Sequence, residues 1–86
     1  MYALRSQLTR EVTSIPLNIA EGSGKHSNDD FARFLRNSIG SLLETDTNLK
    51  IAINLKYLNN EDYSKVDKII EKLYFKLIAF CKKLKE

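Results

Sequence analysis

The chain has 86 residues and a formal net charge of +3, and it contains one proline, three glycines and one cysteine. Apolar residues make up 43% and charged residues 29%, which is too apolar for a disordered chain and sufficient for one small domain over residues 1–86. This composition disfavours an all-β fold, excludes an internal disulfide and leaves no apolar run near the roughly 20 residues of a membrane span. With a single cysteine and no evident secretory leader, we expect a cytoplasmic protein.

The first predicted helix covers about residues 3–21. Its apolar residues recur at steps of three and four, which places them on one face of a helix. They are Leu4, Leu8, Val12, Ile15 and Ile19. Polar residues, Glu11 among them, are expected to lie mostly away from this stripe.

Pro16 interrupts the first helix, because it has no N–H for the carbonyl four residues earlier and its ring crowds that carbonyl. We expect a bent helix in which Ser14 and Asn18 hydrogen-bond freed backbone groups. Gly22 is expected to end the helix in the left-handed conformation that glycine adopts easily.

The second predicted helix covers about residues 28–57. Ser27 followed by Asp30 resembles a capping box, and Asp29 adds negative charge at the positive end of the helix dipole. A seam at steps of four and three includes small residues that permit close approach of another helix. It consists of Phe31, Leu35, Ser38, Leu42, Thr45, Leu49 and Ala52.

The third predicted helix covers about residues 60–85, with Asn59 or Asn60 as its N-terminal cap. Its apolar residues alternate steps of three and four without a break, as in antiparallel bundles and coiled coils. They are Tyr63, Val66, Ile70, Leu73, Leu77, Phe80 and Leu84. Ile69, Tyr74 and Ile78 widen this seam, which indicates more than one neighbouring helix.

These three amphipathic segments with short connections predict an all-α, antiparallel up-down helical bundle with crossing angles of roughly 20°. The widened apolar faces indicate a further packing partner, since a long exposed apolar stripe promotes association. Another copy of the chain would supply that partner, so we expect a homo-oligomer.

Several segments resemble, in the right order, the proteins encoded in the intervening sequences of 23S ribosomal RNA genes. The most specific is the string SIPLNIAEGSG, which begins at Ser14. The other segments cover most of the remaining chain. They are Phe31–Leu35, Gly40–Leu42, Glu44–Leu49 and the run from Tyr57 to Tyr63.

The resemblance implies a four-helix bundle that assembles as a ring, often a pentamer, with nucleic-acid binding, no catalysis and no cofactor. It extends to the accessory protein of diversity-generating retroelements. Family members usually begin with a further helix ahead of the segment matching Met1–Gln7, so this sequence supplies three of the four helices. Thr45 stands where the family usually carries leucine. The signature residues are expected to be structural: Ser14, Pro16, Asn18, Glu21 and Gly22.

The sequence shows no pattern typical of an active site or a metal centre. His26 lies in a polar linker without a second histidine or cysteine, and Cys81 lies on an apolar helix face, as a core thiol does. The Gly22–Lys25 segment lacks the spacing of a phosphate-binding loop and follows a helix where that motif requires a strand. We therefore expect a protein that is not an enzyme, with no metal and no small-molecule substrate.

The pattern that most favours a function is basic. One side of the third predicted helix carries a stripe roughly 27 Å long by helical rise. Its members are Lys65, Lys72, Lys76 and Lys83, with Lys68 slightly aside. Further basic candidates on the other helices are Arg5, Arg10, Arg33 and Arg36. Such a surface attracts a phosphate backbone, although a lysine-rich face also serves solubility alone.

The leading hypothesis is a self-associating bundle protein that binds RNA or DNA through these lysine and arginine side chains. The alternative is a structural or adaptor oligomer that contacts other proteins without nucleic acid. An unrecognised enzyme ranks third, because no catalytic cluster is visible.

Overall fold

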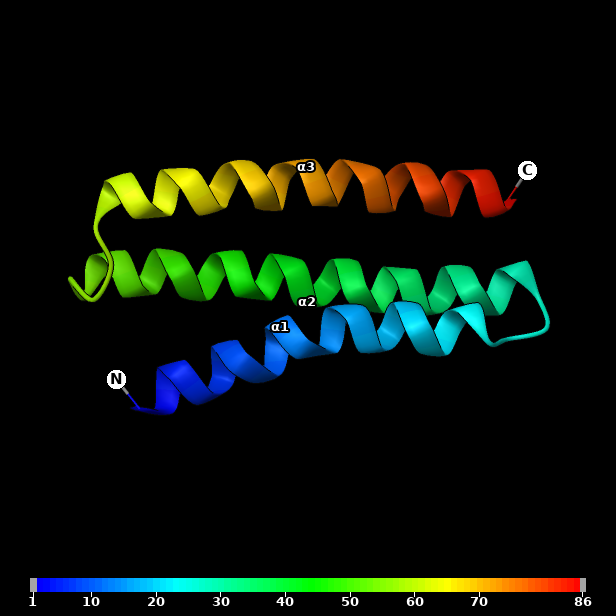
Figure 1. The fold of residues 1–86 in the computed structure, drawn as a ribbon, viewed down its shortest axis with the longest axis horizontal. Coiled ribbons are helices and arrows are strands. Elements are labelled where there is room, and N and C mark those ends of the chain that lie inside the picture. The colour runs from blue at the N-terminus through cyan, green and yellow to red at the C-terminus, as the bar shows by residue number, and fades with distance from the viewer. Residues whose placement is uncertain (1, 86) are drawn as a thin grey trace.

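The computed structural model describes residues 2–85, which form three helices (Figure 1). They are α1 (Tyr2–Ser23), α2 (Asn28–Asn54) and α3 (Asn60–Lys85). The all-α prediction is confirmed, and the described residues contain no strand. None of the three described helices combines the length and the apolarity needed to cross a membrane.

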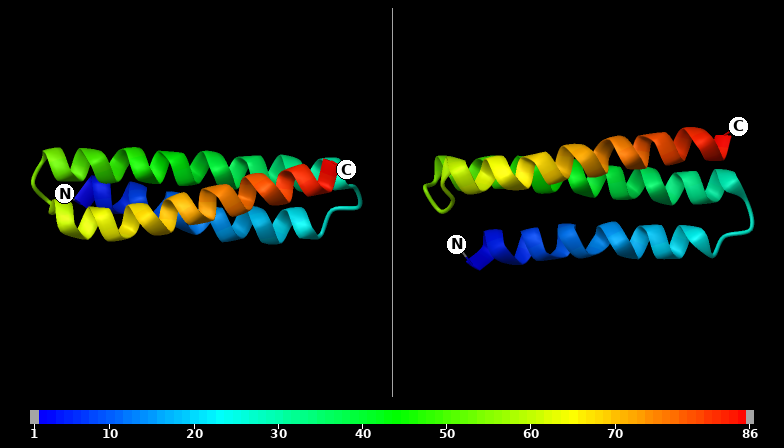
Figure 2. Two further views of the ribbon diagram at one scale, coloured as in Figure 1. Left: turned by 90° about the horizontal axis from the view of Figure 1, so that it is seen from above. Right: turned by 45° about the horizontal axis from the view of Figure 1, so that its top comes forward.

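Helix α2 lies in the middle and packs against both of the other helices, which run antiparallel to it (Figures 1 and 2). Within the described residues the backbones of α1 and α3 do not approach each other. The Cα trace measures 44 × 23 × 13 Å along its principal axes, so the three helices form a flattened layer. The up-down topology is therefore as predicted, and the bundle is open between α1 and α3.

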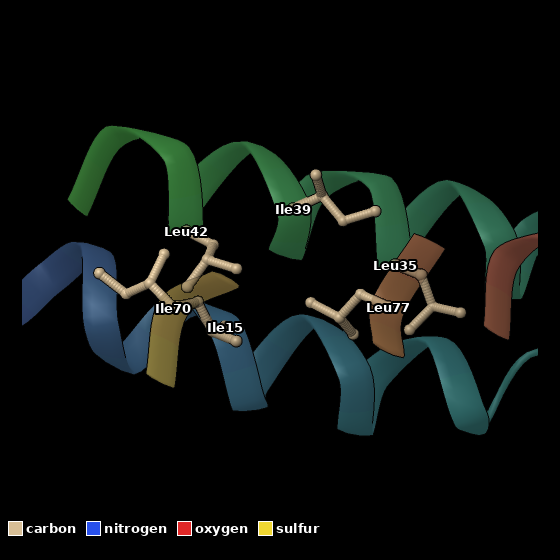
Figure 3. Close-up of a cluster of buried hydrophobic side chains, with 6 residues drawn as sticks. All are labelled: Ile15, Leu35, Ile39, Leu42, Ile70 and Leu77. Atoms are coloured by element: carbon tan, nitrogen blue, oxygen red, sulfur yellow. The ribbon is translucent and has the colours of Figure 1, made fainter. Parts of the chain in front are cut away.

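The apolar core is centred on α2 (Figure 3). Its buried side chains are Ile15 from α1, Leu35, Ile39 and Leu42 from α2, and Ile70 and Leu77 from α3. Leu35 and Ser38 are fully enclosed. The predicted seam of α2 is confirmed, because all of its residues are buried or half-buried.

The burial predicted for the side chains of α1 was wrong at two positions, Val12 and Glu11. Val12 is 49% exposed, whereas Glu11 is only 9% exposed and its Oε1 accepts a hydrogen bond of 2.7 Å from Nδ2 of the buried Asn48. The physical reason is that α1 meets α2 mainly through small and polar side chains. Ser38 Oγ donates to the Ile15 carbonyl at 2.8 Å, and the hydroxyls of Ser14 and Ser41 are hydrogen-bonded to each other.

Helix α1 continues through Pro16 without a break. The flanking polar side chains bind carbonyls in the turns around the proline, but neither of them binds the Val12 carbonyl that Pro16 leaves without its helical donor, so the predicted bonding of freed groups was wrong. Ser14 Oγ donates to the Glu11 carbonyl at 2.9 Å, and Asn18 Nδ2 donates to the Ser14 carbonyl at 2.8 Å.

The conformational role predicted for Gly22 was wrong. Gly22 lies inside α1, and no glycine among the described residues has a positive φ. Its role is steric, because a Cβ at this position would lie 2.7 Å from Phe34 Cβ and 2.9 Å from Phe31 Cδ1. Glycine is therefore required where the end of α1 presses against the start of α2.

Helix α2 ends at Asn54 and not at residue 57, because Lys56 adopts the left-handed conformation with φ of 64°. The Lys56 N–H donates to the Ile53 carbonyl at 2.9 Å, and the Tyr57 N–H donates to the Ala52 carbonyl at 2.8 Å. These two bonds form a Schellman motif, which closes a helix without continuing it.

Both predicted N-terminal caps are present. Ser27 Oγ accepts from the Asp30 N–H at 3.1 Å, and Asn59 Oδ1 accepts from the Asp62 N–H at 2.7 Å. Each satisfies a donor that the first turn of a helix otherwise leaves unpaired.

Helix α3 buries only part of its predicted seam. Ile70 and Leu77 are buried against α2, whereas Val66 and Phe80 remain 36% and 46% exposed. The reason is the open layer, because among residues 2–85 the backbone of α3 approaches that of α2 but not that of α1.

Candidate nucleic-acid-binding surface

The candidate surface is the solvent-exposed side of α3. All five of its predicted lysines are exposed: Lys65, Lys68, Lys72, Lys76 and Lys83. Because Ile70 and Leu77 face α2, helical periodicity places the lysines on the side turned away from α2. The structure therefore brings these five candidates together on one helix face. We call them the lysine stripe.

The lysine stripe is not neutralised by neighbouring carboxylates. Within the described residues, no carboxylate lies within 4.0 Å of its five ammonium groups, since the ion pairs formed there involve other basic residues. Those pairs are Arg33–Asp30 at 4.0 Å, Lys50–Asp46 at 3.1 Å and Lys85–Asp29 at 3.1 Å. The lysine stripe therefore presents like charges to solvent, and their fields add.

Arg33 belongs to a second basic group, at the turn between α1 and α2. Its guanidinium carbon lies 4.6 Å from the centre of the Phe34 ring, and Lys25 Nζ lies 5.1 Å from the same centre. Both distances are within the range of a cation–π contact. Lys25 is not among the candidate site residues predicted from the sequence. The feature of the sequence that could have indicated this contact is the position of Lys25 in the linker, ahead of an aromatic residue of the next helix.

The structure does not bring the other arginines into the lysine stripe. Arg36 is exposed on α2, and Arg5 and Arg10 are exposed on α1. None of these three arginines is on α3, and the backbone of α1, which carries Arg5 and Arg10, does not approach that of α3 within the described residues.

Helix α3 finishes beside the start of α2 at one end of the layer (Figure 1), and several basic residues belong to this end. The ion pair between Lys85 and Asp29 joins the two helices there. Lys82 and Lys83 lie in the same last turn of α3, and the turn that carries Lys25 is at this end too.

Acidic residues begin α3 at the opposite end of the layer. The first turn of α3 contains Glu61 and Asp62. Tyr63 Oη donates to Asp46 at 2.9 Å, and a carboxylate oxygen of Asp67 lies 3.3 Å from the same hydroxyl. Burial of Tyr63 and these two carboxylates raise the pKa of its hydroxyl above the ordinary value. Tyr63 therefore stays a neutral donor that ties α3 to α2.

The signature residues lie on α1, away from the lysine stripe. Gly22 makes the close contact with α2, whereas the Glu21 side chain is exposed and its backbone carbonyl accepts from the Gly24 N–H at 3.2 Å. Ser14, Pro16 and Asn18 form the turns around the proline. Their contacts are structural, and the exposed carboxylate of Glu21 has no hydrogen bond within the described residues.

The residues considered for catalysis lie apart. His26 is exposed in the first turn, and the half-buried Cys81 directs its sulfur toward the Ala32 carbonyl at 3.9 Å. The described residues form no cluster of histidine, cysteine and carboxylate side chains able to hold a metal ion. What the arrangement offers chemically is a field of fixed positive charge.

Comparison with known proteins gives one result that covers most of the chain. The family model described as the 23S rRNA-intervening sequence protein matches residues 1–79. No curated protein matches the chain significantly.

Proposed function

Because the chain belongs to the family of 23S rRNA-intervening sequence proteins, we propose that it is a non-enzymatic, self-associating bundle protein of the cytoplasm that binds the backbone of RNA or DNA. The observation that carries this proposal is the lysine stripe, which is exposed and free of ion pairs within the described residues.

The geometry of the lysine stripe suits a polyanion better than a small ligand. Lys65, Lys72, Lys76 and Lys83 are seven, four and seven positions apart, so their charges extend over roughly 27 Å along one rigid helix. A nucleic-acid backbone presents phosphates at regular intervals over such a length, and binding releases their counterions. A lysine side chain contributes charge without reading bases, so we expect little sequence preference.

Self-association would multiply this surface. Leu43, Ile51 and Phe75 are exposed apolar side chains at 50%, 42% and 61% exposure, and they lie outside the core cluster. Contact between copies through such residues would remove them from water. In a ring such as the pentamer that the family resemblance implies, the lysine stripes of all copies would combine into one positive field.

The direct test is fluorescence anisotropy of labelled RNA and DNA oligonucleotides titrated with protein, from low to physiological salt. The test variant replaces four lysines of the stripe with glutamine: Lys65, Lys72, Lys76 and Lys83. The matched control also removes four positive charges, two of them from ion pairs, by replacing Lys25, Lys50, Lys56 and Lys85. We expect the wild type and the control to bind, with affinity that falls steeply as salt rises.

The stripe variant should bind far more weakly and lose about one unit of salt slope for each phosphate contact removed. Circular dichroism must show unchanged helicity in both variants. Equal affinity of the stripe variant and the control would mean that total charge, and not the lysine stripe, determines binding.

The alternative function is a structural or adaptor oligomer, and the exposed apolar residues favour it. Light scattering on the eluting protein gives the number of copies, and replacing Phe75 with glutamate should reduce it. A folded protein that associates but binds neither RNA nor DNA at low salt would support the adaptor function. A monomer at high concentration would refute the self-association.

A further inference from the structure

Phe75 is an exposed aromatic side chain on the lysine-bearing side of α3. It is 61% exposed and lies outside the core cluster. Helical periodicity places it at one border of the lysine stripe, since Lys72 precedes it by three residues and Lys68 by seven. Lys82 follows it by seven residues, so a lysine lies about two helical turns away from Phe75 in each direction.

The ring of Phe75 is held by its neighbour Tyr74. The two ring centroids are 5.3 Å apart and the ring planes are inclined by 77°, which is an edge-to-face arrangement. Tyr74 is half-buried and packs against the core, so this contact ties the ring of Phe75 to the packed side of α3. A nearly perpendicular neighbour covers at most one face of a ring, so Tyr74 leaves the other face of Phe75 uncovered.

The charges around Phe75 are mainly positive. Lys68, Lys72 and Lys82 are exposed, and within the described residues none of their ammonium groups lies within 4.0 Å of a carboxylate. The nearest carboxylate along the helix is that of Glu71, four residues before Phe75. The ring therefore lies in a positive field, which attracts anions.

An aromatic ring among lysines suits a strand of nucleotides, because each nucleotide supplies a phosphate for the lysines and a flat base for the ring. In a duplex the bases cover one another's faces, so an aromatic side chain reaches those faces in single strands. A membrane-binding helix has the opposite arrangement, with an apolar centre and lysines at its borders. On α3 the lysine stripe lies between Phe75 and Ile69, which is 66% exposed at the other border.

We propose that the nucleic acid bound along α3 is single-stranded and that one of its bases stacks on Phe75. This inference rests on the proposed nucleic-acid function and names the class of strand that the same surface takes. The lysine stripe holds the backbone, and Phe75 holds a base beside it. Stacking tolerates every base, because each has a π face, so the preference is for single strands and not for a sequence.

The probe is a labelled strand of about twelve thymidine nucleotides, within the roughly 4–16 nucleotides that single-strand-binding sites cover. A control strand of equal length consists of abasic nucleotides, which keep every phosphate and lack every base. A duplex of equal length is the second control. Each is titrated with the full chain at one low salt concentration, and fluorescence anisotropy reports binding.

We expect the thymidine strand to bind at least about fivefold more tightly than the abasic strand, which is the lower end of what one stacked base contributes. Phe75→Leu keeps an apolar side chain and removes the ring. It should lose most of this difference and leave the affinities for the abasic strand and the duplex within about twofold of the wild type. Phe75→Tyr keeps a ring and should bind the thymidine strand within about twofold of the wild type.

A single tryptophan can report the stacking directly, because the chain contains none. In Phe75→Trp, the thymidine strand should quench the indole emission and the abasic strand should not. Leu17→Trp is the matched control, since Leu17 is 65% exposed on α1, whose backbone does not approach α3 within the described residues. The emission of this control should be the same with both strands.

Equal binding of the thymidine and abasic strands, or equal binding of the thymidine strand by Phe75→Leu and the wild type, would overturn this inference and leave backbone binding intact. Absence of binding to either strand and to the duplex would refute the proposed nucleic-acid function as well. Light scattering that gives fewer copies for Phe75→Leu than for the wild type would assign the ring to a contact between copies instead of a base. Binding to vesicles of phosphatidylglycerol, with no binding to nucleic acid, would make this side of α3 a membrane surface.

Discussion

Two glycines inside helices provide a direct test of how α1 packs on α2. Gly22 and Gly40 both lie within helices and neither has a positive φ. A Cβ at Gly22 would lie 2.7 Å from Phe34 Cβ, whereas a Cβ at Gly40 would meet no atom within 4 Å. The same substitution, glycine to alanine, should therefore have opposite effects on stability at the two positions.

The magnitudes follow from two effects. Replacing glycine with alanine inside a helix stabilises it by about 0.8–1 kcal/mol, so Gly40→Ala should raise the free energy of unfolding by that amount. At Gly22 the new methyl group must displace the start of α2, because Phe34 Cβ is fixed to the backbone. Such overpacking costs about 1–3 kcal/mol, and the helix gain near the end of α1 is small. Gly22→Ala should therefore lower the stability by about 1–2 kcal/mol.

The assay is urea unfolding followed by circular dichroism at fixed protein concentration, with thermal melts as a second measure. The quantity to compare is the difference in stability between the two variants, expected to be about 2–3 kcal/mol from the two effects above. If Gly22→Ala is as stable as Gly40→Ala, then α1 and α2 do not approach closely at Gly22 and the steric explanation is wrong.

Two further predictions concern contacts that hold the helices in place. Asn48→Leu should destabilise the fold by about 1–3 kcal/mol, because it removes the 2.7 Å donor to Oε1 of the buried Glu11 carboxylate, and adding Glu11→Leu should recover most of that loss. A double-mutant cycle measures this coupling, and simple addition of the two losses would contradict it. Lys56→Gly should stabilise the protein by about 1 kcal/mol, since the left-handed conformation at φ of 64° is costly for lysine and free for glycine. Lys56→Ala is its control in the same unfolding assay and should give no comparable gain.

The candidate site was predictable in part because it depends on one helix. The spacing of Lys65, Lys72, Lys76 and Lys83 places them on one side of a helix whatever the helix packs against, and the structure leaves all four exposed. Whether they are paired with carboxylates was not predictable, since the partners of a charge come from the tertiary arrangement. The cation–π contacts of Lys25 and Arg33 with Phe34 depend on the path of the first turn, which periodicity does not describe.

The errors on α1 have a common cause. The hydrophobic pattern predicts that Val12 is buried and Glu11 is exposed. Hydrophobicity is the best single indicator of burial when the surface that a helix packs against is unknown. The surface of α2 that faces α1 contains Ser38, Ser41 and Asn48. Because Asn48 donates to the Glu11 carboxylate, Glu11 can be buried against this polar surface, and Val12 stays exposed.

The sequence by itself determined the three helices, their caps at Ser27 and Asn59 and the face of α2 that forms the core, because these follow from local hydrogen bonding and the 3.6-residue period of a helix. The tertiary structure decided how closely α1 approaches α2 at Gly22, which side of α1 is buried, and that α3 leaves Ile69 exposed. These features depend on which surfaces meet across the layer, and that information is shared between residues far apart in the chain.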